Sequence, residues 1–176
     1  MKRILTALAC GALLGTSLSS PAAAQAGDPA LAALRANWQG VIDNIQKSAE
    51  ELSDADYAYR PVSTVRTFGE LIGHVAGSQN MICAAALGEP QPAEDAVEKA
   101  AKTKAALVQA LRASTEYCAK AYALPTARHG ESVQLFGGPS TRIGALTLNA
   151  VHDGEHYGNI ITYMRMKGMV PPSSRR

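Results

Sequence analysis

Apolar residues recur at intervals of three and four along several long segments of this chain, and proline or glycine follows each segment. This spacing places the apolar side chains on one face of an α-helix, which other elements must cover. The first segment begins at Asp28, which can cap a helix whose first turn holds Pro29. We predict an amphipathic helix of about six turns there, with Trp38 in the core. Its apolar stripe consists of Leu31, Leu34, Trp38, Val41, Ile42, Ile45, Ala49 and Leu52.

Three further helices are expected, at 68–87, 94–122 and 147–168. Thr67 and Glu70 can form a capping box at the start of the second helix, and Gly88 begins the stretch that stops it. A hydroxyl in the run that ends at Thr141 can cap the last helix. Four long helices without a convincing run of strands predict an all-α fold, a four-helix bundle at 27–171 with a short C-terminal tail at 172–176.

An irregular stretch is expected at 126–139, between the last two helices. Within it, 131–136 is interpreted as a brief extended segment that precedes two glycines. His129 lies beside Arg128 and Gly130 and is interpreted as a solvated side chain.

Four glycines lie inside predicted helices: Gly73 and Gly77 in the second, and Gly154 and Gly158 in the fourth. Glycine in a helix interior costs up to about 1 kcal/mol relative to alanine, so its presence needs a reason. We expect a close approach of the second and fourth helices at these positions, because those two helices carry the histidines considered below.

Residues 1–26 have the three parts of a cleavable secretory signal. Two basic residues precede an apolar run at 4–18, and small residues follow up to Ala26. The run is shorter than the roughly 20 residues that span a bilayer, so we expect no stable membrane insertion after cleavage. A lipoprotein signal that ends at Cys10 is the alternative, but the residue three before it is not the Leu or Val that such signals use. The mature protein is therefore expected in the periplasm or outside the cell.

The charge of the mature chain excludes two classes of partner. Loss of Lys2 and Arg3 with the signal lowers the basic count from 17 to 15, against 15 acids, so the basic and acidic side chains balance. No basic field remains to attract nucleic acid or an anionic membrane. A small-molecule substrate is the expected partner.

Cys83 and Cys118 remain after cleavage, in a compartment where a disulfide can form. Each lies in a helical pattern among alanines, which favours buried free thiols over a bridge. Neither cysteine belongs to a CxxC or CxxCH motif, so redox and c-type haem chemistry have no support, and no organic cofactor is predicted.

His152 and His156 are four residues apart, so a helix places both imidazoles on one face, about a turn apart. Two imidazoles at this spacing can hold one metal ion. If His74 of the second helix points into the bundle opposite them, three neutral rings can hold a divalent ion and leave positions for water or substrate. Such an open site is typical of catalysis, because the ion lowers the pKa of its bound water or polarises a carbonyl.

Other interpretations of the same residues compete with a metal site. Asp153 or Glu155 can join the histidine pair in a surface ion-pair cluster. The run also matches the H-x-x-E-H pattern of inverted zinc proteases, but nothing acidic follows Glu155 to supply the further ligand. A di-iron carboxylate site needs Glu-x-x-His on two helices, and Glu70 and His74 are four residues apart.

Three motifs occur together in this chain: TFGELIGHVA at 67–76, HDGEHYGN at 152–159 and YMRMKG at 163–168. Together they resemble the DinB/YfiT-like superfamily of metalloenzymes, and the resemblance covers most of the mature chain. It implies a four-helix bundle in which His74, His152 and His156 are the metal ligands. It also implies a homodimer.

Characterised members of that superfamily include transferases and isomerases that use thiols such as bacillithiol or mycothiol. An export signal departs from that pattern, because no reduced thiol pool is maintained outside the cytoplasm. We therefore predict a periplasmic metal-dependent enzyme of hydrolase type, with zinc as the metal and nickel, iron or manganese as alternatives. Glu155 or Tyr157 is predicted to assist proton transfer. A thiol-dependent transferase and a non-catalytic metal-binding or stress-related module are the alternative functions.

Overall fold

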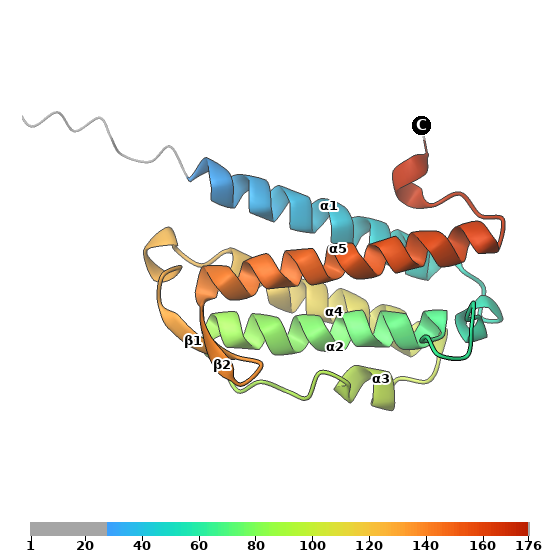
Figure 1. Ribbon diagram of the computed structural model, residues 1–176, viewed down its shortest axis with the longest axis horizontal. Coiled ribbons are helices and arrows are strands. Elements are labelled where there is room, and N and C mark those ends of the chain that lie inside the picture. The colour runs from blue at the N-terminus through green and yellow to red at the C-terminus, as the bar shows by residue number, and fades with distance from the viewer. Residues whose placement is uncertain (1–27, 176) are drawn as a thin grey trace, which may run out of the picture.

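The computed structural model describes residues 28–175, and its helices lie side by side along one long axis (Figure 1). The predicted signal peptide, 1–26, lies outside the described residues. Among those described, no helix is both long enough and apolar enough to cross a membrane. The helices are α1 (Pro29–Glu51), α2 (Phe68–Leu87), α3 (Ala96–Ala100), α4 (Lys104–Tyr122) and α5 (Arg142–Met166). Three-residue 3-10 helices lie at Asp56–Ala58, Thr126–Arg128 and Pro172–Ser174.

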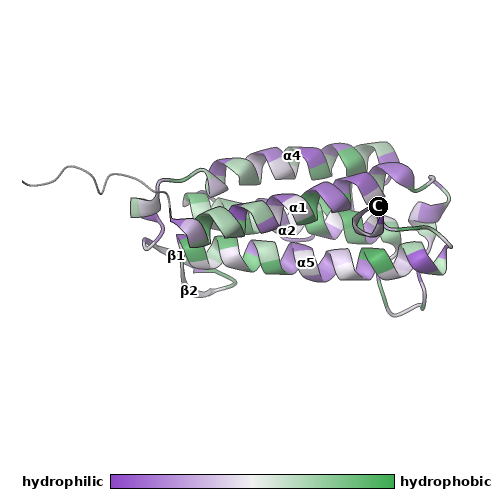
Figure 2. Ribbon diagram, turned by 90° about the horizontal axis from the view of Figure 1, so that it is seen from above, coloured by the Kyte–Doolittle hydropathy of each residue, from purple (hydrophilic) through white to green (hydrophobic). Residues whose placement is uncertain are grey.

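The four long helices form the predicted bundle. Helix α2 packs against α4 and α5, and α1 packs against the same two helices from the other side. Viewed from above, α4 and α5 flank α1 and α2 (Figure 2). Nearly every residue of α2 is buried, as expected of a helix whose sequence is apolar all round. The core includes Trp38, Ile42, Ile45, Ile72, Ile82, Leu111, Leu146, Ile160 and Met164.

The predicted helix starts are confirmed by their caps. The side chain of Asp28 accepts a hydrogen bond from the backbone N–H of Ala30 at 2.9 Å. Thr67 and Glu70 form the complete capping box of α2. The hydroxyl oxygen of Thr141 accepts from the backbone N–H of Gly144 at 3.1 Å and caps α5. Each cap satisfies backbone donors that have no partner within the helix.

The third predicted helix, 94–122, is wrong as a single element. The structure has the short α3 and then α4, with Ala101 in an extended conformation between them. A new helix begins because the hydroxyl of Thr103 accepts from the backbone N–H of Ala106 at 3.2 Å. The alanine-rich and lysine-rich composition favours helix throughout, and the break contains neither proline nor glycine, so composition concealed it. The break lets α3 lie across α2 rather than extend α4.

The stretch expected to be irregular contains a β-hairpin, which adds a small sheet to the helical fold. Strand β1 (Ser132–Leu135) pairs antiparallel with β2 (Gly138–Thr141). Phe136 and Gly137 between them both have positive φ, as a two-residue hairpin turn requires. The expected extended segment is therefore confirmed, whereas the second strand was not predicted. His129 is buried and its Nε2 lies 3.1 Å from the carbonyl oxygen of Leu124, so the prediction of a solvated side chain is wrong.

Cys83 and Cys118 form a disulfide that joins α2 to α4, so the favoured prediction of free thiols is wrong. Both side chains are buried, as expected. Their Cα atoms are 5.2 Å apart, a distance that suits a disulfide. The local pattern around each cysteine does not specify which helices become neighbours, and this is the information that decides between a bridge and two free thiols.

Candidate metal centre

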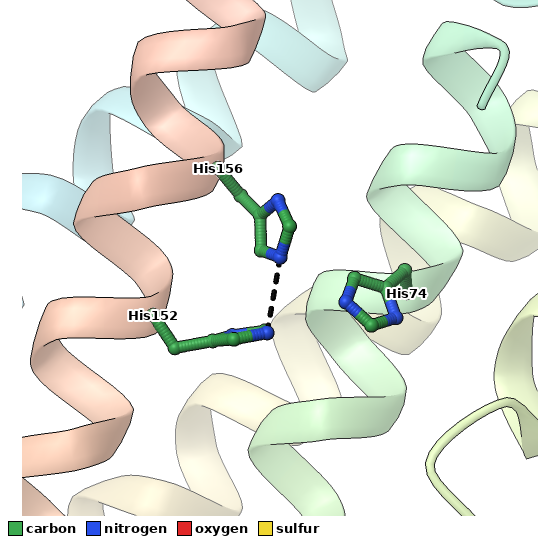
Figure 3. A group of neighbouring side chains, drawn as sticks. All are labelled: His74, His152 and His156. Carbon is green, nitrogen blue, oxygen red and sulfur yellow. Dashed lines mark hydrogen bonds between the residues drawn. The ribbon is translucent and has the colours of Figure 1, made fainter. Parts of the chain in front are cut away.

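Three histidines meet between α2 and α5 (Figure 3). His74 comes from α2, and His152 and His156 from α5; one nitrogen of each ring lies within 4.8 Å of the other two. The Nε2 atoms of His152 and His156 are 3.0 Å apart. Zinc binds imidazole nitrogen at about 2.0–2.1 Å, so two nitrogens in a tetrahedral site are about 3.3 Å apart. The α5 pair already has nearly this spacing, and a small approach of His74 completes a three-nitrogen site.

Burial makes the three rings neutral at neutral pH. It lowers the pKa of His74 to about 4 and that of His156 to about 3, and it also lowers the pKa of His152. The positive charge of Arg66 lowers all three pKa values further. A neutral imidazole keeps a lone pair on one ring nitrogen, and metal binding requires that lone pair.

The rings are left short of hydrogen-bond partners. Nδ1 of His74 and Nδ1 of His152 are buried and have no partner among the described residues. Buried polar atoms in folded proteins nearly always have a partner, so these two atoms need an explanation. The two Nε2 atoms that face each other on α5 are donors or acceptors according to tautomer, and an ion between them could bind both lone pairs. The residues present therefore fit a divalent metal ion bound by nitrogen.

Two glutamates lie beside the two ring nitrogens of His74: Glu94, which precedes α3, and Glu98, which lies within it. Oε1 of Glu94 lies 3.9 Å from Nε2 of His74, and Oε2 of Glu98 lies 4.0 Å from its Nδ1. The hydroxyl of Ser78 donates to Oε1 of Glu94 at 2.9 Å. Nε of Arg66 donates to both carboxylate oxygens of Glu98, each at 3.2 Å. A carboxylate beside a ligand histidine orients the ring and raises its basicity.

Sequence reasoning missed both glutamates, because acids at the start of an alanine-rich helical segment are common where they complement the helix dipole. The signal that could have found them is the pair of glycines in α2. A Cβ on Gly77 would lie 2.0 Å from the carbonyl oxygen of Glu94, and one on Gly73 would lie 2.9 Å from Cα of Glu98. The two glycines on either side of His74 thus admit the backbone of residues 94–98.

The expected reason for the helix glycines is therefore wrong. Gly73 and Gly77 contact the α3 segment and not α5. No heavy atom lies within 4 Å of a Cβ built on Gly154 or Gly158, so no close approach of α2 and α5 requires them. The structure gives no physical reason for glycine at these last two positions.

The two residues predicted to assist proton transfer do not join the three rings. Glu155 is exposed on α5 and is not part of the group of candidate ligand atoms. The hydroxyl of Tyr157 donates to Oγ of Ser173 at 2.8 Å and accepts from the backbone N–H of Ser173 at 3.1 Å. Asp153 is fully buried, so its alternative assignment to a surface ion-pair cluster is wrong.

A cavity of about 600 Å³ adjoins His156, one of the three histidines. Its walls are the connector before α2, here residues 60–66, together with the first turn of α2 and part of α5. His156 forms part of the lining. The amide nitrogen of Asn159, also in the lining, lies 3.4 Å from Nδ1 of His156. The hydroxyl of Tyr163 donates to the carbonyl oxygen of Arg66 at 2.9 Å and so holds the connector against α5. The centre is thus open to a molecule of small-ligand size.

A four-helix bundle with three neutral histidines beside an open cavity defines the class as a helical bundle with a candidate metal site. The particular family follows from the sequence: residues 37–160 match the model of the DinB superfamily, and the chain belongs to this superfamily. No curated protein matches the chain.

Three solved structures share the fold. A DinB-like protein from Bacillus cereus ATCC 10987 matches with a TM-score of 0.68 and 15% identity, covering 79% of this chain and 93% of that one. The DinB-like protein YjoA from Bacillus subtilis matches with a TM-score of 0.64 and 21% identity, covering 82% and 99%. YfiT from Bacillus subtilis matches with a TM-score of 0.63 and 16% identity, covering 83% and 92%. YfiT is described as a probable metal-dependent hydrolase with an unusual four-helix bundle topology.

Proposed function

We propose that this protein is a metal-dependent hydrolase of small molecules, with His74, His152 and His156 as the metal ligands. The observation that carries the proposal is the convergence of three neutral imidazoles on one point between α2 and α5, with His74 and His156 buried and His152 half-buried. The description of YfiT as a hydrolase supports the reaction class, and the similarity of fold supports the comparison. Zinc is the proposed ion because imidazole suits it, with nickel, iron and manganese as alternatives.

The ion, when bound, supplies a Lewis acid and lowers the pKa of a bound water to near neutrality. The Nε2 side of the His74 ring faces His152 and His156 (Figure 3), so Nε2 is the nitrogen directed to the ion, and Nδ1 faces Oε2 of Glu98 at 4.0 Å. In the reaction, the water oxygen bonds to the carbonyl carbon of an ester or amide, the bond to the leaving oxygen or nitrogen breaks, and that atom takes up a proton.

We assign the proton transfer to Glu94 in preference to the predicted Glu155 and Tyr157. Its Oε1 lies beside Nε2 of His74, and the hydrogen bond from Ser78 fixes that oxygen. Glu94 is partly exposed, so water reaches its second oxygen. Tyr157, in contrast, already uses its hydroxyl as donor and acceptor with Ser173.

Two features favour a hydrolase over the alternatives. The Cys83–Cys118 disulfide supports the proposed export to the periplasm or beyond, where a thiol-dependent transferase would lack its cosubstrate. The cavity beside His156 supports catalysis over a purely metal-binding or stress-related module, since storage of an ion needs no substrate space. Homodimerisation remains a prediction.

Metal analysis and an activity screen test the proposal. Protein purified without an affinity tag should contain a divalent metal and hydrolyse members of an ester and amide panel. His74→Ala should lose both the metal and the activity, whereas Glu94→Gln should keep the metal and lose the activity. His129→Ala is the matched control, because His129 lies outside the centre. Protein that binds no metal, or His74→Ala protein with unchanged turnover, would overturn the proposal.

A further inference from the structure

The cavity beside His156 contains one guanidinium group whose two terminal nitrogens have no hydrogen-bond partner among the described residues. Arg66 donates to Glu98 through Nε alone, so its Nη1 and Nη2 make no bond there. Arg60, the second arginine of the lining, is already engaged. Its Nη1 donates to the carbonyl oxygen of Val65 and its Nη2 to Glu70, both at 3.3 Å. Arg66 is thus the arginine of this cavity whose two terminal nitrogens, Nη1 and Nη2, are both available to bind a ligand.

Arg66 is held in place relative to the histidines. Tyr163 of α5 binds its carbonyl oxygen, and Glu98 binds its side chain. Arg66 and His156 both line the cavity, so a single ligand can contact the two residues at once. The Arg66 side chain is 42% exposed but anchored at Nε by Glu98, and its planar pair of terminal nitrogens suits recognition of a planar, two-oxygen group.

The other lining groups limit what these two terminal nitrogens can bind. The charges of Arg60 and Arg66 are balanced by those of Glu70 and Glu98, so the cavity has no excess positive charge for a dianion. Phosphate would meet two carboxylates, whereas a carboxylate carries one negative charge and pairs with the two terminal nitrogens side by side. Pro61, Val65 and Leu71 provide apolar wall for a hydrocarbon part of the ligand.

We propose that Arg66 selects substrates with a carboxylate, which it binds through Nη1 and Nη2 while the scissile ester or amide faces His156. The substrate class is therefore a small monocarboxylate with an ester or amide bond and an apolar group. The volume of about 600 Å³ suits such a molecule and not a polymer. This inference rests on the proposed function, because it names the substrate of the same centre.

Binding to metal-free protein separates the contribution of Arg66 from any binding to the ion. The probes are N-benzoylglycine, its uncharged methyl ester and inorganic phosphate, titrated by calorimetry into chelator-treated full-length mature protein. N-Benzoylglycine should bind saturably, and the ester and phosphate about tenfold more weakly or worse, as loss of a charged hydrogen-bonded pair implies. Arg66→Gln should weaken N-benzoylglycine binding about tenfold, and Arg66→Lys should give an intermediate loss.

Arg112→Gln is the matched control, because Arg112 pairs with Glu50 on the exposed surface of the bundle and does not line this cavity. It should bind N-benzoylglycine as the unchanged protein does. Thermal unfolding of each variant verifies that it is folded. Any of three results would overturn the inference. The acid and the ester could bind equally well, Arg66→Gln could leave the affinity for the acid unchanged, or the acid could show no saturable binding.

A zinc titration of the same samples distinguishes the two proposals. If the unchanged protein binds no metal, the proposed function fails even where the carboxylate selection by Arg66 is observed. If it binds metal but Arg66→Gln leaves carboxylate selection intact, only the inference about substrate fails.

Discussion

Helix α5 carries two groups of polar side chains, one directed toward α1 and one toward α2, and they differ in how their hydrogen bonds are satisfied. Asn149 and Asp153 belong to a closed network: Oδ2 of Asp153 accepts from Nε1 of Trp38 at 3.2 Å and from Asn149 at 3.3 Å. The amide of Asn149 also donates to the hydroxyl of Tyr122, which donates to the carbonyl oxygen of Leu146. His152 and His156 follow Asn149 and Asp153 by three residues each. Their hydrogen-bond partners are each other and Asn159, and Nδ1 of His152 has none among the described residues.

Burial disfavours the charged form of both groups but leaves them with different chemistry. It raises the pKa of Asp153 well above its usual range and lowers the pKa values of the histidines. The network then uses its donors and acceptors internally, apart from Oδ1 of Asp153, which has no partner among the described residues. On the histidine side, Nδ1 of His152 has no partner among the described residues, and the two Nε2 atoms of His152 and His156 are bonded only to each other. Burial alone therefore does not identify a binding site. The informative side chains are those whose polar atoms lack hydrogen-bond partners within the protein.

The largest expected effect is on metal affinity, and it tests whether the histidines act independently of the Asp153 network. His152→Ala should weaken zinc binding by more than about a hundredfold, because it removes one of three proposed ligands. Asp153→Asn, the adjacent control, should leave zinc affinity unchanged, because the Asp153 carboxyl group bonds to Trp38 and Asn149 and not to the histidines. Competition with a chelating indicator measures both. Comparable losses in the two variants would show that the two faces of α5 are not independent.

A smaller effect concerns stability. Trp38→Phe removes the donor to Asp153 and should lower the free energy of unfolding of the metal-free protein by about 2 kcal/mol. Tyr122→Phe should act in the same direction, because the Tyr122 ring stacks on Trp38 at 4.1 Å and its hydroxyl belongs to the same network. Urea unfolding and zinc titration should show a loss of stability with unchanged zinc affinity. A loss of zinc affinity without loss of stability would contradict the division between the two groups.

The smallest effect concerns Glu131, which pairs with Arg128 and with Arg142 at the start of α5 and serves as a reference for both groups. Hydrogen bonds from Arg128 and Arg142 lower the pKa of Glu131 to about 2, from an ordinary value of 4.5. A depressed carboxyl pKa stabilises the fold above the unfolded value, and this contribution is lost as pH falls from 4.5 through about 2. Glu131→Gln should therefore flatten the fall in stability over that range. An unchanged acid limb in denaturant titrations would show that these ion pairs contribute nothing.

Local patterns were sufficient to predict the four helices and the histidine pair. Capping residues such as Thr67 and Thr141 mark helix starts by chemistry that operates within three residues. The four-residue spacing of His152 and His156 places them on one face in any helix. These features require no knowledge of which helices become neighbours.

Features that depend on contacts between elements were not predictable in this way. The Cys83–Cys118 bridge requires α2 beside α4, and the positions of Glu94 and Glu98 require α3 to cross α2 at Gly73 and Gly77. In the sequence these acids have the same character as any solvated charge. The break at Ala101 was concealed for a related reason, since helix propensity favours continuation and the packing of α3 on α2 opposes it.

The Cys83–Cys118 cross-link encloses the segment that holds Glu94 and Glu98. A chain unfolded with this bond intact keeps both carboxylates tethered within a closed loop that begins nine residues after His74. The volume that these groups must search to return to the histidine is therefore restricted, and on a chain-entropy account the cross-link stabilises the fold by about 4 kcal/mol. The disulfide thus does more than join two helices, because it keeps Glu94 and Glu98 near His74 before the bundle has refolded.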